Sequence, residues 1–225
     1  MARMIHVFSG VALALLVACP ASAATLEVLL RQADGSKVAD GVVTLQGPAG
    51  AFNGVLKADM DQRGQRFAPH VLAVHTGTQV RFPNSDNIRH QVYSFSAAKR
   101  FELRLYEGTP TDPLLFDKPG VVVLGCNIHD WMLGYIYVTD DPRFGVSDAQ
   151  GRVRLEQLPP GDYHATVWHP QLKDMQPLDG GTLHITAAGL SHNVVLSLEP
   201  TSADIPPTPS AFGDAFNRAS RETAQ

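Results

Sequence analysis

The sequence predicts an all-β protein made of antiparallel sandwiches. Its apolar residues fall in short runs, at residues 26–30, 71–74, 121–124 and 135–138. Residues 101–105 alternate strictly between apolar and polar, as expected of a half-buried strand. No convincing amphipathic helix occurs in the body of the chain. Short strands separated by turn signals at this spacing favour an antiparallel sandwich.

Composition sets broad limits on class and partners. The chain has 225 residues, which is enough for one large or two small domains. Its 44% hydrophobic and 18% charged content is typical of a globular protein. The formal net charge is −4 and no basic run occurs, which argues against nucleic acid as a partner.

The N-terminus has the layout of a secretory signal peptide over residues 1–23. Arg3 precedes an apolar run at residues 11–18, and small residues follow before an expected cleavage near Ala23 or Ala24. The run is too short to remain in a bilayer as a spanning helix. Residues 16–19 also resemble a bacterial lipoprotein box, in which Cys19 would be lipidated and tether the protein to a membrane; Pro20 directly after it favours ordinary cleavage. Both alternatives predict a periplasmic location.

Residues 24–57 are predicted to form an N-terminal β-hairpin. Its strands are residues 26–30 and 42–45, and Asp34-Gly35-Ser36 is a turn signal between them. A boundary is expected at residues 140–142, followed by a second hairpin over residues 146–155 with its turn at residues 150–151. Residues 200–225 are rich in proline, serine, threonine and alanine, and we expect a disordered tail.

A thiol, an imidazole and a thioether follow one another in a short turn between two predicted strands. They belong to Cys126, His129 and Met132. Sulfur ligands are soft and imidazole is borderline, so the set suits copper that changes between two oxidation states. After ordinary cleavage Cys126 is the only cysteine left, and a lone thiol in an oxidising compartment favours ligation over an inert buried cysteine. His90 follows a polar turn upstream and supplies the second histidine that a blue-copper site requires.

The region from about residue 67 to residue 138 resembles the amicyanin and plastocyanin group of cupredoxins. The spacing Cys126-x2-His129-x2-Met132 is most like that of amicyanin. The flanking residues agree, with Pro119-Gly120 before the cysteine strand and Phe82-Pro83-Asn84 before His90-Gln91-Val92. Residues 127–128 and 130–131 depart from the family, since amicyanins carry prolines there. This departure affects the expected stiffness of the loop and the potential of the site.

This resemblance implies a Greek-key cupredoxin β-sandwich over residues 58–139. One type 1 copper per chain would be bound by His90, Cys126 and His129, with Met132 as the long axial ligand. Each histidine would be fixed by a hydrogen bond from its other ring nitrogen. Asn84 would hydrogen-bond between the two ligand segments, as in the cupredoxins that it resembles; the alternative is plain turn chemistry.

Residues 140–199 resemble the carboxypeptidase regulatory-like or transthyretin-like β-sandwich module. The resemblance rests on the short motifs Asp148-Ala149-Gln150-Gly151 and Pro160-Gly161-Asp162-Tyr163. The N-terminal hairpin resembles the first strands of the same module. We therefore expect residues 25–57 to pair with residues 140–199, so that the copper domain is inserted in the sequence.

The remaining aromatic and histidine residues are expected to have structural roles. Trp131 lies inside the ligand loop, where it would pack beside the metal, contact a redox partner, or hold the loop down. A lone histidine is more often structural than a ligand. We apply that interpretation to His70, His75, His164, His169, His184 and His192.

The sequence therefore predicts a non-enzymatic, periplasmic type 1 copper protein that carries single electrons. Its partners would be secreted redox proteins such as a dehydrogenase or a c-type cytochrome, and a membrane would be involved only through lipidation at Cys19. The alternative is a periplasmic copper carrier or chaperone that binds copper through the same residues. An enzyme would need an open coordination position or a second metal. An interaction protein without metal would take up no copper.

Overall fold

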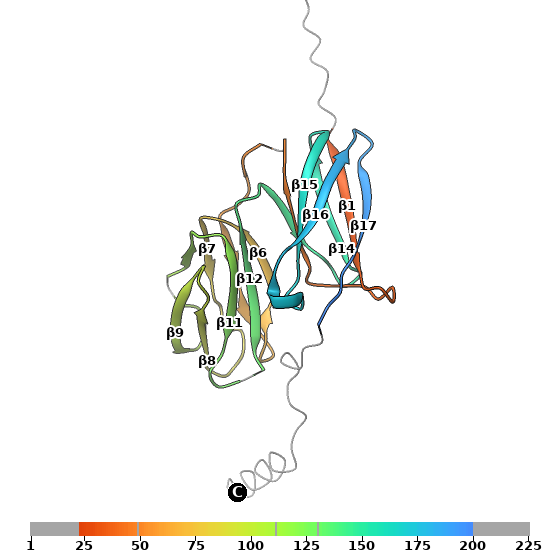
Figure 1. Ribbon diagram of the computed structural model, residues 1–225. Helices are drawn as coiled ribbons and strands as arrows, with labels where there is room; N and C mark the ends of the chain where they lie inside the picture. The colour runs from red at the N-terminus through yellow and green to blue at the C-terminus, as the bar shows by residue number, and fades with distance from the viewer. Residues whose placement is uncertain (1–22, 49, 111, 130, 200–225) are drawn as a thin grey trace, which may run out of the picture.

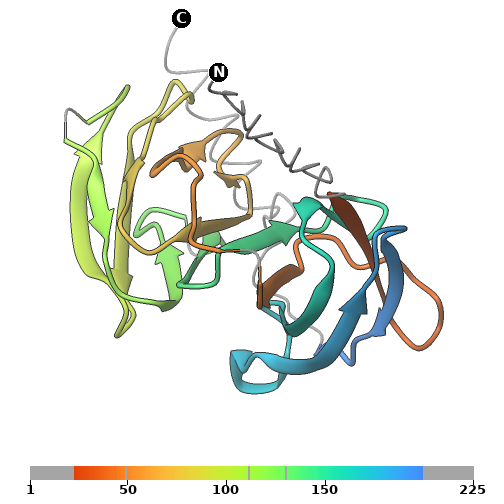
Figure 2. The same ribbon diagram turned by 90° about the horizontal axis from the view of Figure 1, so that it is seen from above.

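The structure is a computed structural model that describes residues 23–48, 50–110, 112–129 and 131–199. The expected signal peptide, apart from Ala23, and the expected tail at residues 200–225 lie outside these residues. The described chain forms strands β1 to β17 and one short 3-10 turn, η1 (Lys173–Met175). None of its helices is long and apolar enough to cross a membrane. The protein is all-β, and its strands form two β-sandwiches that lie side by side (Figures 1 and 2).

The central sandwich spans residues 57–139. Its larger sheet has the order β6-β12-β11-β8-β9 and its smaller sheet the order β10-β7-β3. A short pair of strands, β4 (Asp61–Gln62) and β5 (Phe67–Ala68), lies beside them. The bounds of the larger sheet are β6 (Val71–His75), β8 (His90–Phe95), β9 (Arg100–Tyr106), β11 (Gly120–Gly125) and β12 (Leu133–Thr139). Those of the smaller sheet are β3 (Lys57–Asp59), β7 (Thr78–Arg81) and β10 (Leu114–Phe116).

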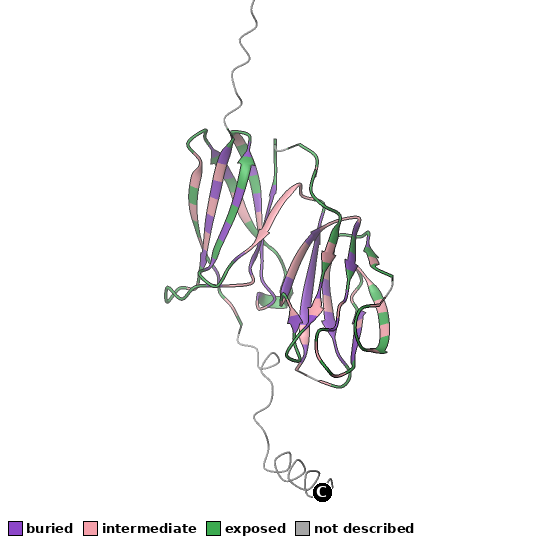
Figure 3. Cartoon of the chain, turned by 180° about the vertical axis from the view of Figure 1, so that it is seen from behind, coloured by how far each residue is buried: buried purple, intermediate pink, exposed green. Residues whose placement is uncertain are grey.

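Strand β12 shows how the larger sheet buries both of its faces. Side chains alternate across a strand, so Ile136 and Val138 enter the core of the central sandwich while Tyr135 and Tyr137 point to the opposite face. Figure 3 shows the buried residues along these strands. The central core also contains Cys126 and Met132, together with Met60, Phe67, Val74, Val80, Phe82, Val92, Phe116, Val122 and Leu124.

The terminal sandwich is built from both ends of the described chain, residues 24–47 and 140–199. One sheet has the order β14-β1-β17 and the other β13-β2-β15-β16. The strands are β1 (Ala24–Arg31), β2 (Val42–Gln46), β13 (Arg143–Val146), β14 (Arg152–Leu158), β15 (Gly161–Trp168), β16 (Leu178–Ile185) and β17 (Leu190–Val195). Strand β1 pairs with β14 and β17, and β2 pairs with β13 and β15. The expected pairing of the N-terminal strands with residues 140–199 is therefore present.

Two hairpins were predicted in this sandwich, and both predictions are wrong. The turn after β1 forms, with the Gly35 N–H donating to the Gln32 carbonyl, but β1 and β2 belong to different sheets. In the same way β13 and β14 flank a turn and lie in different sheets. Both sheets face one core, to which β1 contributes Leu26 and β2 contributes Leu45. The chain therefore crosses from one sheet to the other at each turn, which a local sequence pattern does not distinguish from a hairpin.

The two sandwiches meet along a buried apolar interface. Trp168 of β15 is fully buried and packs against Tyr135 and Tyr137 of β12, with ring centroids 6.0 and 5.2 Å away. Val42 of β2 and Val71 of β6 belong to the same cluster. The terminal sandwich thus covers the outer face of the sheet whose strands β11 and β12 flank the ligand loop.

Candidate metal centre

His90 begins strand β8, and its imidazole is fully buried. A nearby carboxylate fixes the ring, because the Nε2 of His90 lies 2.8 Å from the Oδ2 of Asp86. The same carboxylate accepts hydrogen bonds from the backbone N–H groups of Gly64 and Gln65, at 2.6 and 2.9 Å. A carboxylate that holds one ring nitrogen of a histidine orients the other nitrogen toward a metal. The Nδ1 of His90 is therefore the atom presented to the site.

Asp86 is held in its charged form at the edge of this site. Burial alone would raise the pKa of its carboxyl group. Hydrogen bonds from the Gln65 N–H, from His90 and from the Gly64 N–H outweigh that effect and leave the pKa below its ordinary value. The ionised carboxylate accepts the Nε2–H of His90, which leaves the Nδ1 lone pair free for a metal ion.

Cys126 directly follows strand β11, and it is the buried free cysteine of the described chain. Its backbone is placed by close packing one residue earlier. A Cβ atom at Gly125 would come within 2.7 Å of the Tyr93 ring, so a glycine is needed here for the Tyr93 ring to pack against the backbone. Gly125 pairs with Tyr93 of β8 and with Leu133 of β12, which joins the strand of His90 to both ends of the loop.

His129 lies in the loop between β11 and β12 and is partly exposed. Burial lowers the pKa of its imidazole, and the nearby His90 lowers it further, while the charge of Asp86 acts in the opposite direction. The ring of Trp131 lies 5.2 Å from the His129 ring at an interplanar angle of 57°. Trp131 thus packs beside the His129 ring, and its expected position beside the metal stays a prediction.

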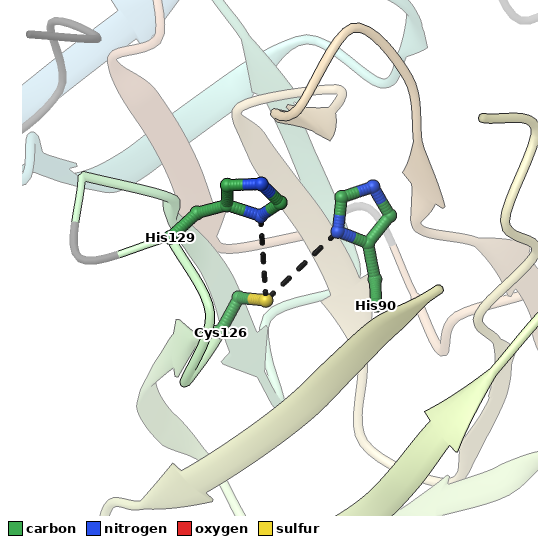
Figure 4. A group of neighbouring side chains, drawn as sticks. All are labelled: His90, Cys126 and His129. Carbon is green, nitrogen blue, oxygen red and sulfur yellow. Dashed lines mark hydrogen bonds between the residues drawn. The ribbon is translucent and has the colours of Figure 1, made fainter. Parts of the chain in front are cut away.

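The three side chains converge on one point (Figure 4). The Sγ of Cys126 lies 3.9 Å from the Nδ1 of His90 and 3.9 Å from the Nδ1 of His129. The donor atoms of all three residues lie within 4.8 Å of one another. A first-row metal ion held at about 2.1 Å from nitrogen and about 2.3 Å from sulfur, in a trigonal arrangement, places those atoms about 3.8 Å apart. The observed spacing fits such an ion.

Met132 is buried in the same apolar cluster as Cys126. Its backbone N–H donates to the carbonyl of His129 at 2.9 Å, which closes the loop into a tight turn. The structure thus places Met132 at the end of the ligand loop, with its side chain in the core of the central sandwich. Its role as the axial ligand stays a prediction.

Asn84 does not make the predicted bridge between the ligand segments among its described hydrogen bonds. Its Nδ2 donates to the carbonyls of Ile88 and Tyr106, at 2.8 and 2.9 Å, and its Oδ1 accepts from the N–H of Asp86. These contacts match the alternative of turn chemistry, because a short amide side chain readily bonds the backbone two residues on.

The bridge is made by another pair, which sequence reasoning missed. The Nδ2 of Asn127 in the ligand loop donates to the Oε1 of Gln91, beside His90, at 2.7 Å. Gln91 is in turn bonded to Glu102 of β9. Asp86 was missed as well, although its position four residues before His90 in a polar turn was a usable signal.

His192 lies on β17 and belongs to no described group with metal-binding spacing, and five other histidines make contacts of their own. His70 contacts Asp40, and His169 donates from Nε2 to the carbonyl of Ala39. His75 stacks on Phe52 at 4.2 Å. His164 and His184 lie near aspartates on the exposed face of β15 and β16. Among the described histidine, cysteine and acidic residues, the one group with metal-binding spacing is His90, Cys126 and His129.

Comparisons with known proteins give partial likenesses. No protein-family model matches the chain, and no curated protein matches it. A copper-containing nitrite reductase from Thermus scotoductus is 28% identical over 36% of this chain and 22% of its own length, with a TM-score of 0.34. A purple cupredoxin from Nitrosopumilus maritimus is 21% identical over 36% of this chain and 99% of its own, with a TM-score of 0.33. An oxidized mutant of amicyanin is 16% identical over 43% and 98% of the two chains, with a TM-score of 0.34. The chain thus spans less than a quarter of the nitrite reductase.

Proposed function

We propose that this protein is a single-copper electron carrier of the periplasm. The observation that carries the proposal is the convergence of one buried sulfur and two imidazole Nδ1 atoms, with both Sγ–Nδ1 distances at 3.9 Å. Thiolate and imidazole donors in a three-membered set, with a methionine beside them, are the ligands of blue-copper sites. When bound, copper would supply a one-electron change between Cu(I) and Cu(II).

The residues of the chain support fast transfer by restricting movement at the site. Asp86 fixes the ring of His90, and the hydrogen bond between Asn127 and Gln91 ties the ligand loop to the strand of His90. Donor atoms that are held in place need little rearrangement when the charge of the metal changes. Cys126 and His90 are buried, which keeps water from the sulfur and from one ligand ring.

His129 provides the route to the surface in this proposal. It is the partly exposed member of the three, and its neighbour Ile128 has 48% of its surface exposed. In this proposal a partner protein contacts the chain beside His129 and Ile128. The partners would be secreted redox proteins, such as a dehydrogenase or a c-type cytochrome.

Voltammetry on the copper-loaded protein, combined with a chelator challenge, tests the proposal. An electron carrier gives a reversible one-electron wave and keeps its copper when a strong chelator is added to either oxidation state. A copper carrier would lose the metal rapidly to the chelator and give an irreversible wave. That second result would contradict electron transfer and favour the delivery of copper through the same residues.

A further inference from the structure

Asp40 of the terminal sandwich lies beside the ligand-loop segment of the central sandwich. This residue lies between β1 and β2, and its Oδ2 is 3.0 Å from the Nδ1 of His70. Asp40 and His70 line a cavity of about 200 Å³ together with Trp131 and Met132 of the ligand-loop segment. The wall of this cavity also includes Arg66, Phe67 and Leu133. One acidic side chain of the second sandwich thus shares a cavity with the predicted axial ligand.

Asp40 is held in place by buried polar groups of its own sandwich. Its φ angle of 62° lies in the left-handed region, which is uncommon for residues other than glycine and which aspartate and asparagine adopt more readily than most. The backbone N–H of Asp40 donates to the carbonyl of Ser147 at 3.1 Å, and the N–H of Gly41 donates to the Oγ of Ser147 at 2.8 Å. On the other side, the Nε2 of His169 donates to the carbonyl of Ala39 at 3.1 Å. Because both Ser147 and His169 are buried, the loop that presents Asp40 is fixed.

His70 connects Asp40 to the first residues of β12. The carbonyl of His70 accepts the N–H of Tyr135 at 2.9 Å, and its ring meets the Tyr135 ring edge-on at 5.3 Å. The parallel pairing of β6 with β12 begins one residue later, at Val71 and Tyr135. Met132 directly precedes β12, so it lies three residues before the Tyr135 N–H that His70 binds.

We propose that Asp40 is a positioning residue for the segment of Met132, which makes the terminal sandwich a structural part of the metal centre. The inference rests on the proposed copper site only for its effect on the metal. Its first consequence concerns the protein without metal: the contact between Asp40 and His70 restrains the backbone at residues 132–135. Its second consequence is that the loss of this contact alters the environment of the bound copper.

Amide hydrogen exchange of the metal-free protein tests the first consequence. Glycine adopts the left-handed conformation without strain, so Asp40→Gly removes the side chain and keeps the backbone of the loop. His70→Phe removes the same contact from the other sandwich and keeps a ring beside Tyr135. Asp40→Asn retains both an acceptor oxygen and tolerance of positive φ. Asp162→Ala is the matched control, because it removes an aspartate–histidine contact on the exposed face of the terminal sandwich.

The proposal expects exchange at the amides of Met132 and Tyr135 to rise about tenfold in Asp40→Gly and His70→Phe, while the amides of β7 keep their protection. Asp40→Asn and Asp162→Ala should stay within about twofold of the unmodified protein. Unchanged exchange at Met132 and Tyr135 in both Asp40→Gly and His70→Phe would overturn it. If one of the two variants fails to fold, the other decides.

The copper-loaded proteins test the second consequence separately. We expect Asp40→Gly to shift the reduction potential and the paramagnetic resonance signal, and Asp162→Ala to leave both unchanged. Faster exchange in the metal-free variants, combined with no copper binding by the unmodified protein, would keep the positioning role and refute the proposed function. Unchanged exchange in the metal-free variants, together with an intact blue-copper signal, would refute the positioning role and keep the proposed function.

Discussion

Two histidine–aspartate contacts, one in each sandwich, have similar distances but differ in their burial and in their surroundings. His90 and Asp86 lie 2.8 Å apart in the central sandwich, and His184 and Asp162 lie 2.6 Å apart in the terminal one. The His90 side chain is 0% exposed, whereas that of His184 is 72% exposed. The first contact orients a ring whose other nitrogen faces a buried sulfur. The second contact joins two solvated side chains and contributes little to the stability of the fold. The comparison teaches that convergence and burial, rather than the contact itself, make a candidate site.

Replacing the histidine of each pair should give the largest difference in copper affinity between the two sandwiches. His90→Ala removes one of three converging donors, and we expect copper affinity to fall by at least ~100-fold. His184→Ala should leave the affinity unchanged, since His184 belongs to no metal-binding group among the described residues. Competition with a chromophoric copper chelator measures both. Equal losses in the two variants would place the metal elsewhere.

Replacing the aspartate of each pair should give a smaller difference in copper affinity, again with the larger loss in the central sandwich. Asp86→Ala removes the group that orients His90, and loss of such a group typically costs about 10–100-fold in metal affinity. Asp162→Ala removes an exposed contact and should cost less than about twofold. The same chelator competition applies. An Asp86→Ala protein with unchanged affinity would show that the ring of His90 is held by its packing alone.

The buried hydroxyl of Ser147 in the terminal sandwich should contribute to the free energy of unfolding. The Oγ of Ser147 accepts from the Gly41 N–H and donates to the carbonyl of Val38. Ser147→Ala leaves both backbone groups without this partner, and we expect the free energy of unfolding to fall by about 1–3 kcal/mol in urea titrations. The exposed Ser191 provides the control, because Ser191→Ala should change it by less than about 0.5 kcal/mol. A neutral Ser147→Ala would mean that other groups hold this loop.

The smallest expected effect is a pH dependence of the metal-free protein. Burial, and then the proximity of His90, lower the pKa of His129 below the value of about 6.5 for a free histidine. The unfolded chain then binds the proton more readily than the folded chain, so stability falls as the pH drops below about 6.5. His129→Gln should weaken this dependence in urea titrations at several pH values. An identical slope in the variant would assign the effect to another group.

The sequence indicated the convergence because its donors are close together in one turn and His90 begins a strand beside it. It also predicted that the N-terminal strands pair with residues 140–199, because both outer segments resemble one module, and β1 does pair with β14 and β17. These are statements about residue type and spacing, which the sequence carries directly.

The rest depends on spatial relations that spacing does not encode. A turn between two strands has the same local pattern whether the strands pair or cross to opposite sheets, so the expected hairpins at residues 24–57 and 146–155 were wrong. The hydrogen bond between Asn127 and Gln91 joins residues 36 positions apart. The contact of Asp40 with His70 depends on the packing of two sandwiches, which only the structure shows.

The most direct test of the account is the visible absorption and paramagnetic resonance spectrum of the protein loaded with Cu(II), recorded beside Cys126→Ser. We predict an intense thiolate-to-copper band and narrow hyperfine splitting in the unmodified protein, both lost in the variant, because the buried Sγ lies between two imidazole nitrogens. A colourless protein, or weak copper binding that Cys126→Ser leaves unchanged, would contradict a copper site at His90, Cys126 and His129.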